Sequence, residues 1–375
     1  MAGLYIHIPF CLSKCYYCDF YSHVGEPDFS LFLNVLKKEL EVRKYYLNEE
    51  LSTIYFGGGT PSLLTAGQLS EIFDTIYKHY KVDSSVEITL EANPDDLSDR
   101  YLKELKQLPI NRLSIGAQTF DDSILMALRR RHDEDDIKRS VLKAQNIGFS
   151  NISLDIIYCL PNFTVKDLKA ELRKIEELNI QHLSAYHLTI EKNTVFYTLL
   201  NKRIIKEVDE EESYAQYNTI IEWADRNNFI QYEVSNFGKI GRFSRHNSNY
   251  WRRVPYIGVG PSAHSYNGYI RRWNVSDLKE YLRFEELNGK IYQEEILSEN
   301  DKFNDFILLS LRTSWGIDLD QLKSEFGHEK MQHVVSILKK YIETEHAVIT
   351  DNIAKLTPEG LFISDKIISE IFIID

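Results

Sequence analysis

The fold of this chain is limited most strongly by a regular alternation of short apolar runs with amphipathic stretches over its first half. The first amphipathic stretch places Phe32, Leu36 and Leu40 on one helical face. Further helices are expected near residues 66–80, 98–107, 134–147 and 165–178. Strands are expected at residues 4–8, 53–56, 86–90, 112–115, 152–157 and 182–186. Strands separated by helices predict a parallel α/β sheet with right-handed crossovers, as a partly open barrel or a doubly wound sheet.

The pattern changes after about residue 195. A predicted helix over residues 209–228 is followed by a Gly- and aromatic-rich region, 231–274, which we expect to be irregular. A short hairpin that turns through Asp351 and Asn352 follows three helices, and one last helix follows the hairpin. These helices are expected near residues 301–313, 318–326, 329–343 and 358–371. Helices followed by a small hairpin indicate a winged-helix-like module.

Charge and cysteine usage exclude several classes of protein. The chain has 375 residues, with 44 Lys and Arg against 56 Asp and Glu, and its net charge of −12 argues against binding nucleic acid. No signal peptide is visible, and no stretch approaches the roughly 20 apolar residues that span a bilayer. Three of the four cysteines are clustered, so a secreted disulfide framework is not expected. We therefore expect a cytoplasmic protein whose C-terminal module packs or binds a partner.

The clustered cysteines follow the first expected strand directly, in the run Cys11-Leu-Ser-Lys-Cys15-Tyr-Tyr-Cys18. Three thiolates on one loop can hold three irons of a cubane cluster and leave the fourth iron open to a second molecule. The alternative is a structural zinc site, which needs four ligands. No ligand pair with zinc-site spacing stands downstream, although Cys159 could supply one ligand. The ligand count therefore favours an iron–sulfur cluster.

This C-x₃-C-x-aromatic-C run resembles the signature of the radical S-adenosylmethionine (SAM) superfamily. The resemblance implies a [4Fe–4S] cluster on Cys11, Cys15 and Cys18, whose open iron chelates the amino and carboxylate groups of SAM. It also implies reductive cleavage of SAM to a 5′-deoxyadenosyl radical, which is chemistry of the cofactor. The usual fold of the superfamily is a partial (β/α)₆ barrel with its site at the carboxyl ends of the strands, which agrees with the six expected strands.

Polar residues and glycines stand where the later strands end. Residues 57–61 read Gly-Gly-Gly-Thr-Pro, and such bare backbone allows a ligand to approach closely, although a tight turn without a ligand is the alternative. Glu91, Gln118 and Asp155 follow the next three strands. One such residue alone would more often be a helix cap, but three on successive strands predict a common site. Arg130 lies between two other arginines, and a solvated basic turn is its alternative.

The whole set closely resembles the family of oxygen-independent coproporphyrinogen III dehydrogenase and its relatives. The matching segments are Tyr5-Ile-His-Ile-Pro-Phe-Cys11, Cys18-Asp19-Phe20, Phe56-Gly-Gly-Gly-Thr-Pro61, Ile115-Gly-Ala-Gln118 and Leu154-Asp-Ile-Ile-Tyr158. The SAM contacts that this resemblance implies are Tyr5, Gly58, Gly59, Thr60, Glu91, Gln118, Arg130 and Asp155. One position departs from the family, because relatives usually have glycine where Cys159 stands.

Two features resemble the heme-chaperone branch of this family. The dehydrogenases carry a fourth cysteine where this chain has Phe20, and the branch has phenylalanine there. An H-N-x-x-Y-W heme-binding motif is matched by His246, Asn247, Tyr250 and Trp251. Histidine is a common axial ligand of heme iron, and neighbouring arginines could pair with propionates. A buried loop with packed aromatic side chains is the alternative. His264, in another family-like segment, is interpreted as structural.

The resemblance implies a heme chaperone that binds heme and a SAM-ligated cluster and delivers the heme to hemoproteins, with respiratory hemoproteins as the expected recipients. An electron donor such as flavodoxin and peripheral docking to a membrane are compatible with it. The expected parts are a radical SAM partial barrel (1–200), a barrel-capping region with the heme motif (201–295) and the winged-helix-like module (296–375). The alternatives are the decarboxylating dehydrogenase itself and a structural zinc protein.

Overall fold

The computed structural model describes residues 1–25 and 28–374. Its centre is a 12-stranded mixed sheet in the order β14-β13-β12-β11-β1-β4-β5-β6-β7-β8-β10-β9. All six expected strands are present, adjacent and parallel, so the prediction of a parallel α/β core is confirmed. They are β1 (Ala2–Ile8), β4 (Leu51–Gly58), β5 (Val82–Ala92), β6 (Arg112–Gln118), β7 (Ile152–Tyr158) and β8 (His182–His187).

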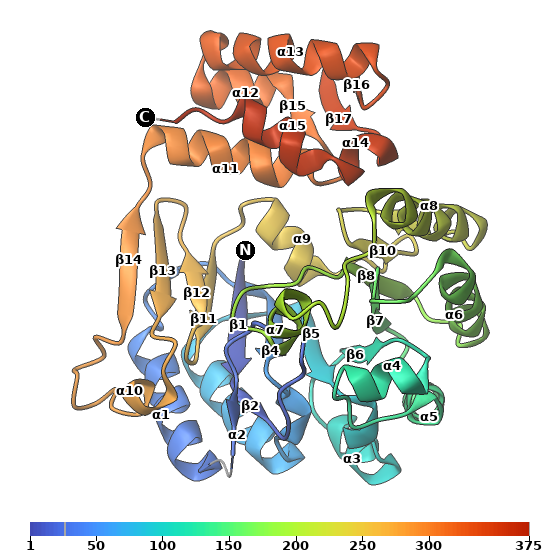
Figure 1. Cartoon of the computed structure of the whole chain (residues 1–375). Helices are drawn as coiled ribbons and strands as arrows, with labels where there is room; N and C mark the ends of the chain where they lie inside the picture. Colours follow the sequence, from blue (N-terminus) through green and yellow to red (C-terminus); the bar gives the residue numbers. More distant parts are fainter. Residues whose placement is uncertain (26–27, 375) are drawn as a thin grey trace.

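Helices α1 to α6 connect these strands and cover the outer face of the sheet, whereas α7 and α8 follow the last of the six strands (Figure 1). Each buries one apolar stripe, and Phe32, Leu36 and Leu40 are fully buried as their spacing predicts. Thr65 and Asp133 each form a capping box at a helix start, which explains why these helices begin where the periodicity places them. The helices are α1 (Phe29–Val42), α2 (Ala66–His79), α3 (Asp99–Leu105), α4 (Asp122–Ala127), α5 (Glu134–Ile147), α6 (Val165–Glu177), α7 (Val195–Asn201) and α8 (Glu210–Arg226).

The expectation of an irregular region over 231–274 is wrong. This region contains a helix and four strands, two of which pair with the core strands β1 and β8. The strands have three to five residues, which is too few for apolar alternation to be recognised in the sequence. The elements of this region and its flanks are β9 (Ile230–Gln231), β10 (Asn236–Gly238), α9 (Arg245–Trp251), β11 (Tyr256–Val259), β12 (His264–Tyr266), β13 (Ile270–Asn274), α10 (Leu278–Tyr281) and β14 (Tyr292–Ile296).

The C-terminal end has its own hydrophobic core, separate from that of the large sheet. The expected hairpin turns through Asp351 and Asn352, which both have positive φ. The expected last helix is divided at Ile363, so the prediction of one helix is wrong there. The elements are α11 (Glu299–Leu311), β15 (Ile317–Asp318), α12 (Leu319–Phe326), α13 (His328–Glu343), β16 (Ala347–Thr350), β17 (Ile353–Leu356), α14 (Pro358–Phe362) and α15 (Ser364–Ile371). Helix, strand, two helices and a hairpin follow one another as in a winged helix.

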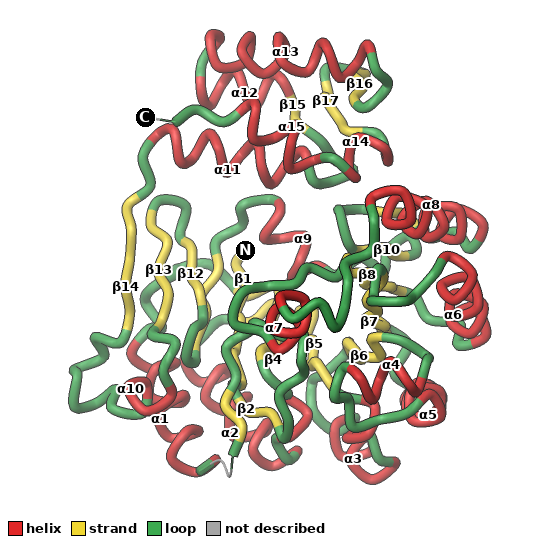
Figure 2. The backbone as a smooth tube through the Cα atoms, in the orientation of Figure 1, coloured by secondary structure: helices red, strands yellow, loops and turns green. Residues whose placement is uncertain are grey.

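Polar contacts join this end to the rest of the molecule, with α11 on the side that faces the sheet (Figure 2). Arg253 donates to Glu325 of α12 at 2.9 Å, and Arg271 forms an ion pair with Asp305 of α11. The Tyr217 hydroxyl of α8 lies 3.1 Å from the carbonyl oxygen of Pro358. Among the described residues, no helix has the length and hydrophobicity that crossing a bilayer requires.

Candidate functional site

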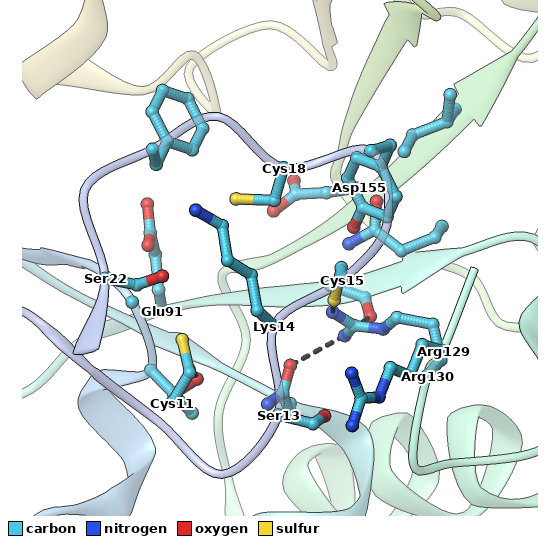
Figure 3. A pocket seen from close by; sticks show the side chains of 18 of the residues that line it. Cys11, Ser13, Lys14, Cys15, Cys18, Ser22, Glu91, Arg129, Arg130 and Asp155 are labelled. Atoms are coloured by element: carbon cyan, nitrogen blue, oxygen red, sulfur yellow. Dashed lines mark hydrogen bonds between the residues drawn. The ribbon is translucent and has the colours of Figure 1, made fainter. Parts of the chain in front are cut away.

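The three clustered cysteines lie on a loop at the carboxyl end of β1. The loop is closed by two short parallel strands, β2 (Phe10–Cys11) and β3 (His23–Val24). All three cysteine side chains are partly buried and line a cavity of about 460 Å³. In Figure 3 the sulfur atoms of Cys11, Cys15 and Cys18 lie around this cavity. Within the described part of the chain, no three His, Cys, Asp or Glu side chains converge on a single metal position.

The surroundings of the three cysteine thiols fit the binding of iron, whose positive charge favours the thiolate form. Burial raises the pKa of Cys11 and raises that of Cys18 to about 11, so both thiols resist ionisation on their own. Irons of a cluster favour the thiolate form and overcome this effect. The Thr60 hydroxyl donates to Sγ of Cys11 at 3.5 Å, and Nη1 of Arg130 donates to Sγ of Cys15 at 3.4 Å. Three separated thiols with such donors fit a [4Fe–4S] cluster held at three corners.

The glycine run after β4 passes close behind the cysteine loop. A Cβ on Gly59 would lie 2.7 Å from the carbonyl oxygen of Phe10 and 3.0 Å from Sγ of Cys11, so only glycine fits. The N–H of Gly58 donates to Oε2 of Glu91 at 3.2 Å. The Tyr55 hydroxyl donates to the other carboxylate oxygen at 2.8 Å. Burial raises the pKa of Glu91 to about 7, so hydrogen bonds donated by a ligand can shift this carboxyl toward its ionised form near neutral pH.

Asp155 lies at the far side of the same cavity and is held by serines. The Ser114 hydroxyl donates to its carboxylate at 3.0 Å, and the Ser153 hydroxyl does so at 3.1 Å. Burial raises the pKa of Asp155 above its usual value. Ser153 also contacts Nδ1 of His182 at 2.7 Å, so a buried hydrogen-bond chain runs from this carboxylate into the barrel interior.

The structure distinguishes the three adjacent arginines. The Arg130 side chain donates to Oδ1 of Asn93 at 2.6 Å and to the carbonyl oxygen of Gly116 at 2.9 Å, besides contacting Cys15. Arg131 instead pairs with Asp95 and Asp96, and Arg129 is exposed. Arg130 is therefore the one of the three whose side chain hydrogen-bonds to a cysteine of the loop, whereas Arg129 contacts the loop through the Tyr16 ring, 5.7 Å from its centroid. The sequence alone does not mark Asn93, the partner of Arg130, as a site residue, although Asn93 directly follows the strand end that carries Glu91.

The expected SAM residues come together almost completely. Gly58, Gly59, Thr60, Glu91, Gln118, Arg130 and Asp155 all line the cysteine cavity. Gln118 has a φ of 68°, at an irregularity in β6 that turns it out of the strand register. Tyr5 alone is not in this wall and lines a second, neighbouring cavity instead.

The heme-motif residues lie on α9, and their histidine is enclosed. His246 is 1% exposed, with Nδ1 2.8 Å from the Thr53 hydroxyl and Nε2 2.8 Å from the Tyr250 hydroxyl. Tyr250 lines the second cavity together with Tyr5, whereas Asn247 and Trp251 line neither of the two cavities. The structure thus brings one of the four motif side chains to a cavity wall.

Cys159 lies away from the other cysteines, in the hydrophobic core. Its φ of 60° is in the left-handed region, which explains why glycine suits this position in relatives. Its N–H donates to Oε1 of the buried Gln216 at 2.8 Å. Cys159 is therefore a thiol at a strained turn rather than a neighbour of the cluster loop.

A parallel partial barrel with a three-cysteine pocket at the carboxyl ends of its strands defines a radical SAM protein, and the model of the Radical SAM superfamily matches residues 5–175. A model of the HemN C-terminal domain matches residues 297–363. Within this class the chain belongs to the HemW family. A Bacillus subtilis protein named heme chaperone HemW is 34% identical over 372 residues, covering 98% of each chain.

Other relatives carry the same name. A heme chaperone HemW of Lactococcus lactis is 36% identical over 86% of this chain and 84% of its own, and that of Escherichia coli is 36% identical over 70% and 69%. Among solved structures, coproporphyrinogen III oxidase (HemN) from Escherichia coli has a TM-score of 0.86 and 21% identity, covering 99% of this chain and 90% of that chain. At this identity the likeness shows the shared fold alone.

Proposed function

We propose that this protein is a heme chaperone, which binds heme and a SAM-ligated [4Fe–4S] cluster and delivers the heme to hemoproteins, respiratory ones in particular. The observation that carries the proposal is the 34% identity to a heme chaperone over 98% of both chains. Phe20 supports it, because the dehydrogenases of this family carry a fourth cysteine at this position.

Cys11, Cys15 and Cys18 are proposed as the cluster ligands. The SAM contacts are proposed to be Tyr5, Gly58, Gly59, Thr60, Glu91, Gln118, Arg130 and Asp155. When bound, the reduced cluster supplies an electron to SAM. In this arrangement the chain's own residues orient the ligands: Glu91 accepts N–H bonds, and Arg130 keeps positive charge beside Cys15. Both groups lie in a partly enclosed cavity, where such interactions are strengthened.

Heme is the cargo in this proposal, and the motif His246, Asn247, Tyr250 and Trp251 on α9 is proposed to form its binding region. Support comes from the second cavity, since its wall includes Tyr250 and several other aromatic side chains that suit a porphyrin face. We further propose that the protein works in the cytoplasm, receives electrons from a donor such as flavodoxin, and docks peripherally where its recipient is a membrane hemoprotein.

Titration of the anaerobically purified protein with hemin tests the proposal. We expect saturable binding near one heme per chain, with the Soret band of protein-bound heme. A protein that carries its cluster but takes up no hemin would contradict the proposal.

The oxidative decarboxylase of the same family is the second candidate, because the chain shares its fold with coproporphyrinogen III oxidase. Incubation of the reconstituted protein with SAM, dithionite and coproporphyrinogen III separates the two. We expect the porphyrinogen to be recovered unchanged, with the Escherichia coli oxidase as positive control. Rapid formation of protoporphyrinogen IX would favour the decarboxylase.

A further inference from the structure

The second cavity lies between the extended edge of the sheet and the C-terminal end of the chain. Its volume is about 590 Å³, which is within the range of about 300–1,000 Å³ that is typical of small-molecule sites. Tyrosines from three elements form one wall: Tyr250 of α9, Tyr256 of β11 and Tyr266 of β12. Leu308 and Leu309 of α11 contribute apolar surface from the C-terminal end. This part of the wall is therefore aromatic and apolar, as the face of a flat macrocycle requires.

This cavity adjoins the cysteine cavity. Phe20, Gly58 and Glu91 line both. The Phe20 side chain is 69% exposed, so it forms part of a surface that a ligand in either cavity can cover. A ligand in the second cavity would consequently lie next to the position proposed for the cluster and SAM.

Three histidines lie in or behind this wall, and they differ in what their rings already bind. His246 uses both ring nitrogens, on Thr53 and Tyr250. His7 uses both as well, Nδ1 with the Tyr5 hydroxyl at 3.1 Å and Nε2 with the carbonyl oxygen of Tyr21 at 3.0 Å. His264 begins β12, lines the cavity and is exposed.

No hydrogen bond joins the His264 ring to any residue that the structure describes. Its ring instead stacks on Trp273 of β13, with centroids 6.1 Å apart and an interplanar angle of 24°. This contact orients the imidazole without occupying its nitrogens. Of the three histidines, His264 is the one that can bind an iron without breaking a protein contact.

Two arginines offer guanidinium donors to heme propionates, in a cavity whose wall also includes the carboxyl groups of Glu91 and Asp305. Arg253 and Arg271 both line the cavity. The hydrogen bonds from Arg253 to Glu325 use Nη2 alone, so its guanidinium has other donors. Arg271 contacts Glu295 at 3.1 Å and Asp305 of α11, which places it where the sheet edge meets the C-terminal end. Guanidinium groups pair well with carboxylates such as propionates.

We propose that heme occupies this second cavity, with His264 as its iron ligand and Arg253 and Arg271 facing its propionates. His246 is then a positioning residue, which holds the Tyr250 side chain against the cavity through its hydrogen bond. This inference rests on the proposed function and adds where the cargo lies and which side chain binds its iron.

Hemin titrations of His264→Ala, His246→Ala and His328→Ala test this assignment. His328 is exposed on α13 and lines neither cavity, so it is the matched control. We expect His264→Ala to lose the histidine-ligated Soret and electron paramagnetic resonance signature and to bind hemin about tenfold or more weakly. Added imidazole should restore the signature, because it replaces the missing ligand. Iron–sulfur content should match that of the wild type.

For His246→Ala we expect weaker hemin binding with the signature of histidine ligation retained, since the iron ligand is still present. Tyr250→Phe, a milder change that keeps the aromatic ring, should show the same signature. An unchanged spectrum and affinity in His264→Ala would overturn the assignment of the ligand, as would loss of histidine ligation in His246→Ala with the cluster intact. If the wild type itself binds no hemin, the proposed function fails, and this inference fails with it.

Discussion

The Nε2 atom of His246 lies 2.8 Å from the hydroxyl oxygen of Tyr250, one turn further along α9. Its other ring nitrogen lies 2.8 Å from the Thr53 hydroxyl of β4. The histidine of the heme motif thus ties its helix to the barrel and fixes the tyrosine that reaches the second cavity. Burial lowers the pKa of His246 to about 3, so the ring is neutral at physiological pH and can donate one hydrogen bond and accept the other.

Removing this ring should cost stability. We expect His246→Ala to lower the free energy of unfolding by about 2–4 kcal/mol, because two hydrogen bonds are lost and a buried cavity is left. Tyr250→Phe, which removes one partner only, should cost about 1–2 kcal/mol. Denaturant unfolding of the metal-free protein measures both, with His328→Ala as the control at an exposed position. Equal stability of His246→Ala and the wild type would contradict the contacts described above.

The clustered cysteines and Cys159 should behave differently. Alanine at Cys11, Cys15 or Cys18 should each abolish the bound iron and sulfide, which in the wild type should reach roughly four of each per chain. Cys159→Gly should leave the iron content unchanged, because this thiol lies in the hydrophobic core. Relief of its positive φ should offset the greater chain entropy of glycine to within about 1 kcal/mol. Iron loss in Cys159→Gly would contradict the assignment of the ligands.

SAM binding should depend on pH through Glu91. The pKa of this buried carboxyl in the free protein is about 7, so the ionised form that accepts N–H bonds dominates only above that pH. Affinity for SAM should therefore fall as the pH is lowered from about 8 to about 6, by up to about tenfold per pH unit below the pKa. Isothermal titration of the cluster-loaded protein measures this. At high pH, Glu91→Gln should bind SAM more weakly than the wild type does. The fall in SAM affinity between about pH 8 and about pH 6 that is due to Glu91 should be absent from this variant.

Arg130 and Arg129 offer a matched pair. Arg130→Ala should lower the free energy of unfolding by about 2–3 kcal/mol and reduce cluster content, because it leaves Asn93 and the Gly116 carbonyl without their charged donor. Arg129→Ala should change stability by less than about 0.5 kcal/mol, as expected of an exposed side chain. Similar effects of the two substitutions would show that the selection among these arginines is wrong.

The parallel core could be predicted from the sequence because each strand is buried and each helix has a clear apolar stripe. All six strands were expected at the positions where they occur, and Cys11, Glu91 and Asp155 were expected at one site because parallel strands end at one edge. Strands β10 to β13 could not be predicted, since they are short and their pairing partners are distant in sequence.

The second cavity could not be predicted from the sequence either, because its wall is built from elements that are distant in sequence. Tyr250, Tyr256 and Leu308 belong to three elements whose meeting depends on the tertiary fold. The sequence predicts a structural role for His264, whereas its side chain is exposed at this cavity. A sequence motif shows which residues occur together, but it does not show which of their atoms are already hydrogen-bonded within the protein. Both ring nitrogens of His246 are hydrogen-bonded in this way.

Transfer of heme to an acceptor protein is the decisive test of a heme-chaperone function. The protein, loaded with one heme and its cluster, is mixed with an affinity-tagged, heme-free b-type cytochrome, and the acceptor is separated and analysed by its reduced-minus-oxidised spectrum. We expect heme to appear on the acceptor faster than from an equal concentration of hemin bound to serum albumin. Heme that remains on the protein, or that moves no faster than from albumin, would contradict a role as a heme chaperone.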